Sequence, residues 1–144
     1  MRKKGFRLKQ VLHYRKEMEK VRKQEFAETK QELEDANNRL NREEERVEHV
    51  NSEFMDRQQE GITASELQIY SSFFRKKSAD IKNQRANVGL LNHELSKRRE
   101  VLLDASKEKK ILETLEKKSS RAIRKEIEEK EKGLMEEIAI RGKK

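Results

Sequence analysis

Hydrophobic residues recur at every seventh position along two long stretches of the chain, and polar residues fill most positions between them. The first series consists of Phe26, Leu33, Leu40, Val47 and Phe54. The second series consists of Leu67, Phe74, Ile81, Val88, Leu95 and Leu102. A strand would show a period of two, whereas a repeat of seven over several heptads predicts helices that pack along a narrow seam. We expect these residues to form the core of a coiled coil.

The periodicity changes outside these two series. Near the N-terminus the same rhythm is displaced by about one residue, at Val11, Tyr14, Met18 and Val21. After Leu102 the apolar positions are Leu103, Ile111, Leu112, Leu115, Ile123, Ile127, Leu134 and Ile138. Because an α-helix has 3.6 residues per turn, drift from a strict repeat of seven predicts continuous helices with a changing supercoil.

The stretch GITASEL, at residues 61–67, is a compact turn signal near the middle of a chain that contains no proline. Gly61 suits the left-handed position that closes a helix. Thr63 and Glu66 have the spacing of a capping box, and Ile62 with Leu67 matches a hydrophobic staple. We therefore expect the chain to reverse direction once, at this stretch.

The predicted fold is an all-α, antiparallel two-helix coiled-coil hairpin with a C-terminal helical overhang, in which residues 1–144 form one domain. Its elements are a helix over about residues 5–60, a turn at 61–63 and a helix over about 64–140. This register sets Phe54 beside Leu67 and Leu40 beside Ile81. The second helix is the longer one, so residues 119–144 are expected to extend beyond the first helix with their apolar stripe uncovered.

Composition supports long helices over a globular core. Charged residues make up 44% of the chain and hydrophobic residues 32%, and there is no cysteine. Such a sequence has too little apolar surface for a core of ordinary proportions, so it forms either disordered chain or helices with narrow seams. No apolar run approaches the roughly 20 residues of a membrane span. We expect a soluble, cytoplasmic protein.

The net charge of +8 is unevenly distributed along the chain. Residues 25–66 carry 13 acidic and 5 basic side chains, whereas residues 67–106 carry 8 basic and 4 acidic ones. These opposite signs favour pairing of the two helices, although each exposed ion pair contributes little. The first 24 residues hold 10 Lys or Arg and 2 Glu, which makes the open end of the predicted hairpin basic.

No catalytic or metal-binding constellation is visible. The glycines form no phosphate-binding loop, and the three histidines, His13, His49 and His93, lie far apart in the sequence. Carboxylate pairs such as Glu43 and Glu44 lie in charged runs, which is typical of a solvated helical face. We predict that the chain is not an enzyme and binds no cofactor and no metal.

Two sequence features have alternative interpretations. The basic N-terminal segment is also compatible with contacts to a phosphate backbone, but its few aromatic residues lie at helical spacing, so no nucleic acid is expected as a partner. Phe73 lies beside Phe74 and off the seam. It is either partly buried against Tyr70 and Lys77 or an exposed anchor for a partner, and both interpretations stay open.

Four stretches stand out in order along the chain: FRLKQVLHYRKEMEK at residues 6–20, GITASELQIYSSFF at 61–74, REVLLDASKEKKILETLEKK at 99–118, and EKGLMEEIA at 131–139. Taken in this order, they resemble the flagellar FliJ family of type III export. Each motif alone is weak, because coiled coils share composition. Their order and spacing make the resemblance more specific, and it covers nearly the whole chain.

The resemblance implies an antiparallel coiled coil similar to the stalk subunit of rotary ATPases. It implies a role as a central stalk and general chaperone that promotes the hexameric flagellar export ATPase and connects it to the cytoplasmic domain of the membrane export gate. It also implies export chaperones as partners, a monomer when free, a peripheral location at the inner membrane, and a part in flagellum assembly, motility and chemotaxis.

The resemblance also implies two sets of binding residues. The ATPase contact would involve Phe6, Leu8, Val11, Leu12, Arg15, Met18, Leu112, Leu115 and Ile123. The export-gate contact would involve Tyr70 and Phe73. Further family positions on that face correspond to Lys77, Asp80 and Gln84, which are polar here and leave the extent of the gate site open.

Alternative functions are a structural coiled coil that forms homo-oligomers through the uncovered stripe, and the stalk of a virulence type III secretion system.

Overall fold

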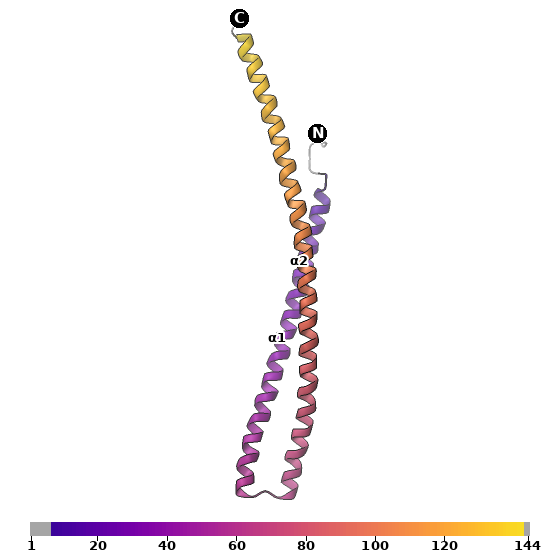
Figure 1. The fold of residues 1–144 in the computed structure, drawn as a ribbon, viewed down its shortest axis with the longest axis vertical. Coiled ribbons are helices and arrows are strands. Elements are labelled where there is room, and N and C mark those ends of the chain that lie inside the picture. The colour runs from indigo at the N-terminus through magenta and orange to yellow at the C-terminus, as the bar shows by residue number, and fades with distance from the viewer. Residues whose placement is uncertain (1–6, 143–144) are drawn as a thin grey trace. The chain divides into compact units, whose positions relative to one another are not determined.

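The computed structural model describes residues 7–142, which form two long helices joined by a short turn (Figure 1). Helix α1 spans Lys9–Glu60 and helix α2 spans Ala64–Gly142. The two helices pack against each other in opposite directions, and the described residues contain no strand. The prediction of an all-α helical hairpin is therefore confirmed.

The turn owes its shape to Gly61 and Thr63. Gly61 has a φ of 103°, a backbone conformation that favours glycine. The Thr63 hydroxyl oxygen accepts a hydrogen bond from the Glu66 backbone N–H at 3.1 Å, which caps the start of α2. The Glu66 carboxylate accepts a hydrogen bond at 2.8 Å from Arg57 of α1. The capping interaction thus involves the threonine side chain, while the glutamate links the two helices across the turn.

The chain divides into two compact units, and each is described by itself. The turn unit comprises Gln24–Glu100 and contains the reversal of the chain. The terminal unit combines the residues up to Lys23 with the residues from Val101 onward. Each unit therefore contains a segment of α1 and a segment of α2.

In the turn unit, residues that are buried or half-buried follow alternating steps of three and four along both helices. On α1 they include Phe26, Thr29, Leu33, Ala36, Leu40, Glu43, Val47, Val50 and Phe54. On α2 they include Tyr70, Phe74, Lys77, Ile81, Gln84, Val88, Leu91, Leu95 and Arg98. This spacing is the knobs-into-holes pattern of a coiled coil. Polar residues occupy many of the intermediate positions, so the seam is only partly apolar.

The register near the turn differs from the predicted one. The Phe54 ring lies 4.9 Å from the Tyr70 ring and 5.7 Å from the Phe74 ring, measured between centroids. Leu67, the predicted partner of Phe54, stays 45% exposed. In a coiled coil, a side chain of one helix packs between side chains that lie one turn apart on the other helix. Phe54 therefore packs between the rings of Tyr70 and Phe74 instead of directly opposite one residue.

The N-terminal part of α1 also differs from the prediction. Leu12 is 3% exposed and Glu19 is 6% exposed, so both face α2 within the terminal unit. Val11, Tyr14 and Val21 are exposed. The predicted displacement of the rhythm by one residue is therefore wrong. The seven-residue repeat continues unbroken from Phe26 back to Glu19 and Leu12. Glu19, a charged residue, therefore occupies a position of the helix–helix seam.

Within the terminal unit, α2 extends beyond α1 (Figure 1). Ser119 and Ile123 are still half-buried, and every described residue from Arg124 to Gly142 is exposed. The large exposed apolar side chains of this overhang are Ile127, Leu134, Met135, Ile138 and Ile140. The uncovered segment therefore begins a few residues later than position 119.

Replacing Gly61 by alanine should destabilise the hairpin, because a Cβ at positive φ costs roughly 1–2 kcal/mol. Gly89 provides the matched control in the same unit, since a Cβ added there meets no atom within 4 Å. Gly89→Ala should stabilise α2 by about 0.5–1 kcal/mol. Thermal unfolding followed by circular dichroism measures both changes, and shifts of the same sign would contradict this account of the turn.

Candidate functional site

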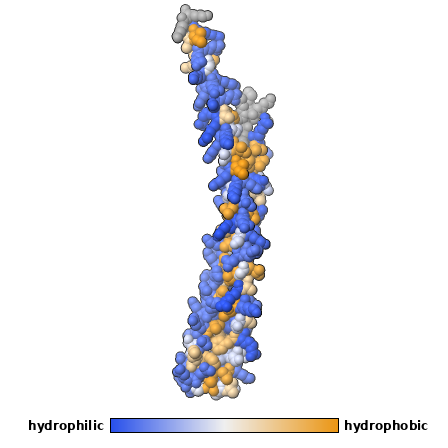
Figure 2. All heavy atoms as spheres, in the orientation of Figure 1, coloured by the Kyte–Doolittle hydropathy of each residue, from blue (hydrophilic) through white to orange (hydrophobic). Residues whose placement is uncertain are grey.

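The terminal unit carries exposed or half-buried apolar side chains along one border of its seam. We call this surface the apolar flank, which consists of Val11, Tyr14, Met18, Val21, Ile111 and Leu115. Val11 directly precedes the seam residue Leu12, and Leu115 directly precedes the seam residue Glu116. When two helices pack in opposite directions, residues at these preceding positions lie on the same side of the seam. Figure 2 shows hydrophobic atoms gathered near the N-terminal end of α1. Tyr14, at 55%, is among the most exposed of these residues on α1.

A buried ion pair lies in the seam of this unit. Glu19 Oε1 accepts a hydrogen bond at 2.9 Å from Lys109 Nζ, and Glu19 Oε2 accepts one at 2.7 Å from the Ser106 hydroxyl. Lys23 Nζ adds a second ion pair with Glu19 at 3.4 Å. Nearby, Arg15 forms an ion pair with Glu108. The charges of this unit therefore join the two helices, while much of its apolar surface faces outward.

These contacts perturb the ionisation of Glu19. The hydrogen bond from Lys109, followed by that from Ser106, lowers the pKa of Glu19 from 4.5 to about 2, although burial opposes the change. The same hydrogen bond raises the pKa of Lys109 above its ordinary value. Both groups are therefore charged at neutral pH, and the buried carboxylate has the partners that its burial requires.

The residues expected to contact the ATPase lie in different environments. Leu8, Val11 and Leu115 are exposed, and Arg15, Met18, Leu112 and Ile123 are half-buried. Leu12 is buried inside the hairpin, so it is unavailable to a partner while the hairpin is closed. Phe6 lies outside the described residues.

Tyr14, Val21 and Ile111 belong to the apolar flank but were not among the expected contact residues. Sequence reasoning placed Tyr14 and Val21 on the helix–helix seam because they are apolar. The signal that identifies them as surface residues is the continuation of the seven-residue step from Phe26 to Glu19 and Leu12.

A second candidate site lies next to the turn, where four aromatic rings form a cluster. Phe54 and Tyr70 pack on Phe74, and the Phe73 ring lies 5.6 Å from the Phe74 ring. Phe73 is half-buried, and the Lys77 ammonium lies 5.9 Å from its ring centroid. Phe73 thus combines partial burial beside Lys77 with an accessible portion of its ring.

The polar positions that follow this cluster have specific surroundings. Lys77 forms a hydrogen bond of 2.6 Å to Glu43, and Asp80 is half-buried. The Gln84 side-chain oxygen is buried, with no hydrogen-bond partner among the described residues. Burial raises the pKa of Tyr70, and the nearby Glu53 carboxylate adds to this effect.

Two properties of the described residues bear on function. No helix within residues 7–142 is both long and apolar enough to cross a membrane. The same residues include no group of three or more His, Asp or Glu side chains arranged to hold a metal ion.

The sequence matches the family model described as Flagellar FliJ protein over residues 3–142. The chain belongs to this family. Searches of curated proteins and of solved structures returned no match. Membership in the FliJ family supports a role in flagellar export, and the family is a non-enzymatic one. The two-helix hairpin agrees with this assignment.

The ion pair of Glu19 should make the stability of this FliJ-family chain depend on pH. Because the folded-state pKa lies below the ordinary value, the carboxylate stabilises the terminal unit above about pH 4.5 and loses this effect as the pH falls towards about 2. Glu19→Gln should reduce the loss of stability in that window.

Melting curves at several pH values, combined with amide hydrogen exchange at residues 12–22, measure the effect. The control is Glu17→Gln, because Glu17 pairs with Lys20 on the exposed side of the same turn. If both variants lose the same pH dependence, the seam position of Glu19 is not its cause.

Proposed function

We propose that this chain is a non-enzymatic stalk of the flagellar export apparatus that binds the hexameric export ATPase through the apolar flank of its terminal unit. The observation that carries the proposal is the distribution of side chains in that unit. Glu19 and Lys109 lie inside the seam, while Val11, Tyr14 and Leu115 lie outside. Exposed apolar surface of this kind marks a site of protein interaction.

The surroundings of the flank favour a protein partner with acidic or polar surfaces. Residues 7–24 hold 7 basic and 2 acidic side chains. Charges at the border of an interface mainly speed association and select partners, while central apolar residues supply affinity. The flank therefore offers apolar residues that supply affinity, and its basic surroundings offer charges that speed association. Both would favour entry into the central opening of the hexameric ATPase.

The aromatic cluster near the turn is proposed as the contact with the cytoplasmic domain of the export gate. Tyr70 is held by Phe54 and Phe74, so its position is fixed before binding. Phe73 lies off the seam and retains an accessible part of its ring. An aromatic side chain that is fixed on one side and open on the other is a typical anchor residue.

The remaining parts of the proposal extend the general export role that family membership supports. The chain would act in the cytoplasm, at the inner face of the inner membrane, as a stalk that promotes the ATPase and also serves export chaperones. It would thereby support flagellum assembly and motility. Family membership supports these roles, and the exposed surfaces of the two units are compatible with several partners.

Removing the apolar flank should weaken binding to the export ATPase. In the double variant Val11→Ser, Leu115→Ser, the loss of about 2 kcal/mol of apolar contact predicts roughly 30-fold weaker binding and less stimulation of ATP hydrolysis. Leu103→Ser is the control, because Leu103 is an exposed apolar residue of the same unit outside the flank. Unchanged affinity and hydrolysis in the folded double variant would contradict the ATPase proposal.

Replacing Phe73 by alanine should abolish most of the binding to the export-gate domain and leave ATPase binding intact. An anchor residue of this kind contributes about 2 kcal/mol or more, which corresponds to at least roughly 30-fold in affinity. Ile69→Ala is the matched control, because Ile69 is exposed on a neighbouring face of α2. Calorimetry with the isolated gate domain measures the change. Equal affinities of the two variants would exclude Phe73 as the anchor.

A further inference from the structure

Two apolar surfaces of the terminal unit are left uncovered by the described residues. One is the apolar flank defined above. The other, which we call the overhang stripe, consists of Ile127, Leu134 and Ile138. These side chains are 47%, 58% and 58% exposed, and their spacing of seven and then four residues places them on one face of α2. A helix with one apolar face is stable in water only when that face packs against another apolar surface.

The apolar flank has the form that such a helix requires. Four of its residues belong to α1, and Ile111 and Leu115 belong to α2, so a third helix lying along the flank would contact both. The α1 residues run from Val11 to Val21, which is about 15 Å along the helix axis. The overhang stripe, residues 127–138, extends over about 17 Å. The two surfaces therefore match in length.

The charges around the two surfaces are opposite in sign. Residues 126–137, around the overhang stripe, hold 6 acidic and 2 basic side chains. Residues 7–24, around the flank, hold 7 basic and 2 acidic side chains, and one of the two acids, Glu19, is buried and paired inside the seam. The outer surface beside the flank is therefore complementary in charge to the overhang.

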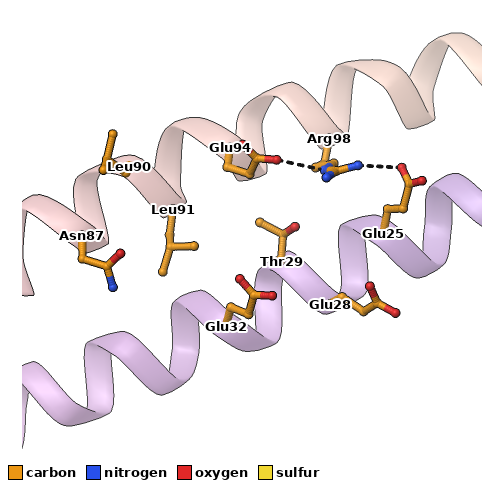
Figure 3. Close-up of a pocket in the computed structure, with 9 residues that line it drawn as sticks. All are labelled: Glu25, Glu28, Thr29, Glu32, Asn87, Leu90, Leu91, Glu94 and Arg98. Atoms are coloured by element: carbon orange, nitrogen blue, oxygen red, sulfur yellow. Dashed lines mark hydrogen bonds and ion pairs between the residues drawn. The ribbon is translucent and has the colours of Figure 1, made fainter.

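The turn unit shows how this chain joins two helices through opposite charges. Arg98 of α2 donates a hydrogen bond of 2.8 Å to Glu25 of α1 and one of 3.2 Å to Glu94 of its own helix (Figure 3). In the overhang, the ion pair of Lys130 with Glu126 lies within a single helix. Exposed pairs within one helix contribute little, so they do not prevent the acidic side chains from facing a basic partner.

We propose that the overhang stripe docks on the apolar flank of a second copy of this chain. Helix α2 is continuous to Gly142, so the overhang leads away from the flank of its own chain. Two copies that meet with their terminal units end to end place each overhang beside the flank of the other copy. The same contact then occurs twice about a two-fold axis, which is the commonest symmetry of protein dimers.

The dimer forms from this chain alone, so it is independent of the proposed ATPase contact. It covers the apolar flank, and a second copy therefore excludes the ATPase from that surface. Because part of the binding free energy is used to keep each overhang helical, the dimer dissociates readily. The free chain thus keeps both apolar surfaces out of water until a partner replaces the second copy.

Analytical ultracentrifugation of the full chain at several concentrations tests the proposal. The expected result is a reversible equilibrium between monomer and dimer that shifts towards monomer as salt rises, because salt screens the attraction between the overhang and the flank. The overhang variant, Leu134→Ser with Ile138→Ser, should weaken dimerisation roughly hundredfold, since each dimer loses four apolar contacts. Ile140→Ser is the control and should leave dimerisation unchanged. Ile140 is 65% exposed and lies two residues from Ile138, on a different face of the helix.

Mixing two variants identifies the surface that receives the overhang. The flank variant, Val11→Ser with Leu115→Ser, keeps its overhang stripe, and the overhang variant keeps its flank. Each variant alone should dimerise weakly, because both contacts of its dimer are damaged. A mixture of the two retains one intact contact, so the heterodimer should be tighter than either homodimer. Sedimentation of the fluorescently labelled overhang variant in the presence of the flank variant measures this difference.

Three results would overturn the inference. One is a chain that stays monomeric up to its solubility limit. Another is a flank variant that dimerises as tightly as the unmodified chain, which would place overhang against overhang. The third is a mixture that associates no better than its separate components. All substituted residues are exposed, and circular dichroism checks that each variant keeps its helices.

Discussion

The ion pair between Glu19 and Lys109 determines how the terminal unit is built. It occupies a position of the helix–helix seam that an apolar residue fills in most coiled coils. Because both charges find partners, burial does not push either group towards neutrality. The apolar residues of the same segments are then free to face outward. The seam of this unit thus combines a charged pair with apolar residues such as Leu12, while other apolar residues of the same segments lie exposed on the flank.

The few hydrophobic residues of this chain are concentrated at the positions where the two helices pack together. In the turn unit they fill the seam, from Phe26 to Phe54 on α1, and aromatic rings close the end near Gly61. Gln84 also lies in the seam, and its buried side-chain oxygen has no hydrogen-bond partner among the described residues. A buried polar atom without a partner lowers the stability of the helix pair. A composition poor in hydrophobic residues therefore limits the stability of the seam.

Sequence periodicity predicted the two helices and the turn well, because both depend on local rules. A repeat of seven predicts a packed helix, and Gly61 followed by Thr63 predicts a reversal with a cap. The register of the terminal unit was not predicted, since assigning apolar residues to the inside fails where a charged pair fills the seam. Tyr14 and Val21 were misplaced for this reason.

The segment from Arg124 to Gly142 is exposed at every described position. A single helix without tertiary contacts is only marginally stable in water. The free energy of local unfolding of this part of α2 is therefore small. Part of the free energy gained when a partner binds this segment is used to keep the segment helical. The complex therefore dissociates more readily than its contact area suggests. The last turns of α2 therefore suit recognition that is selective and short-lived.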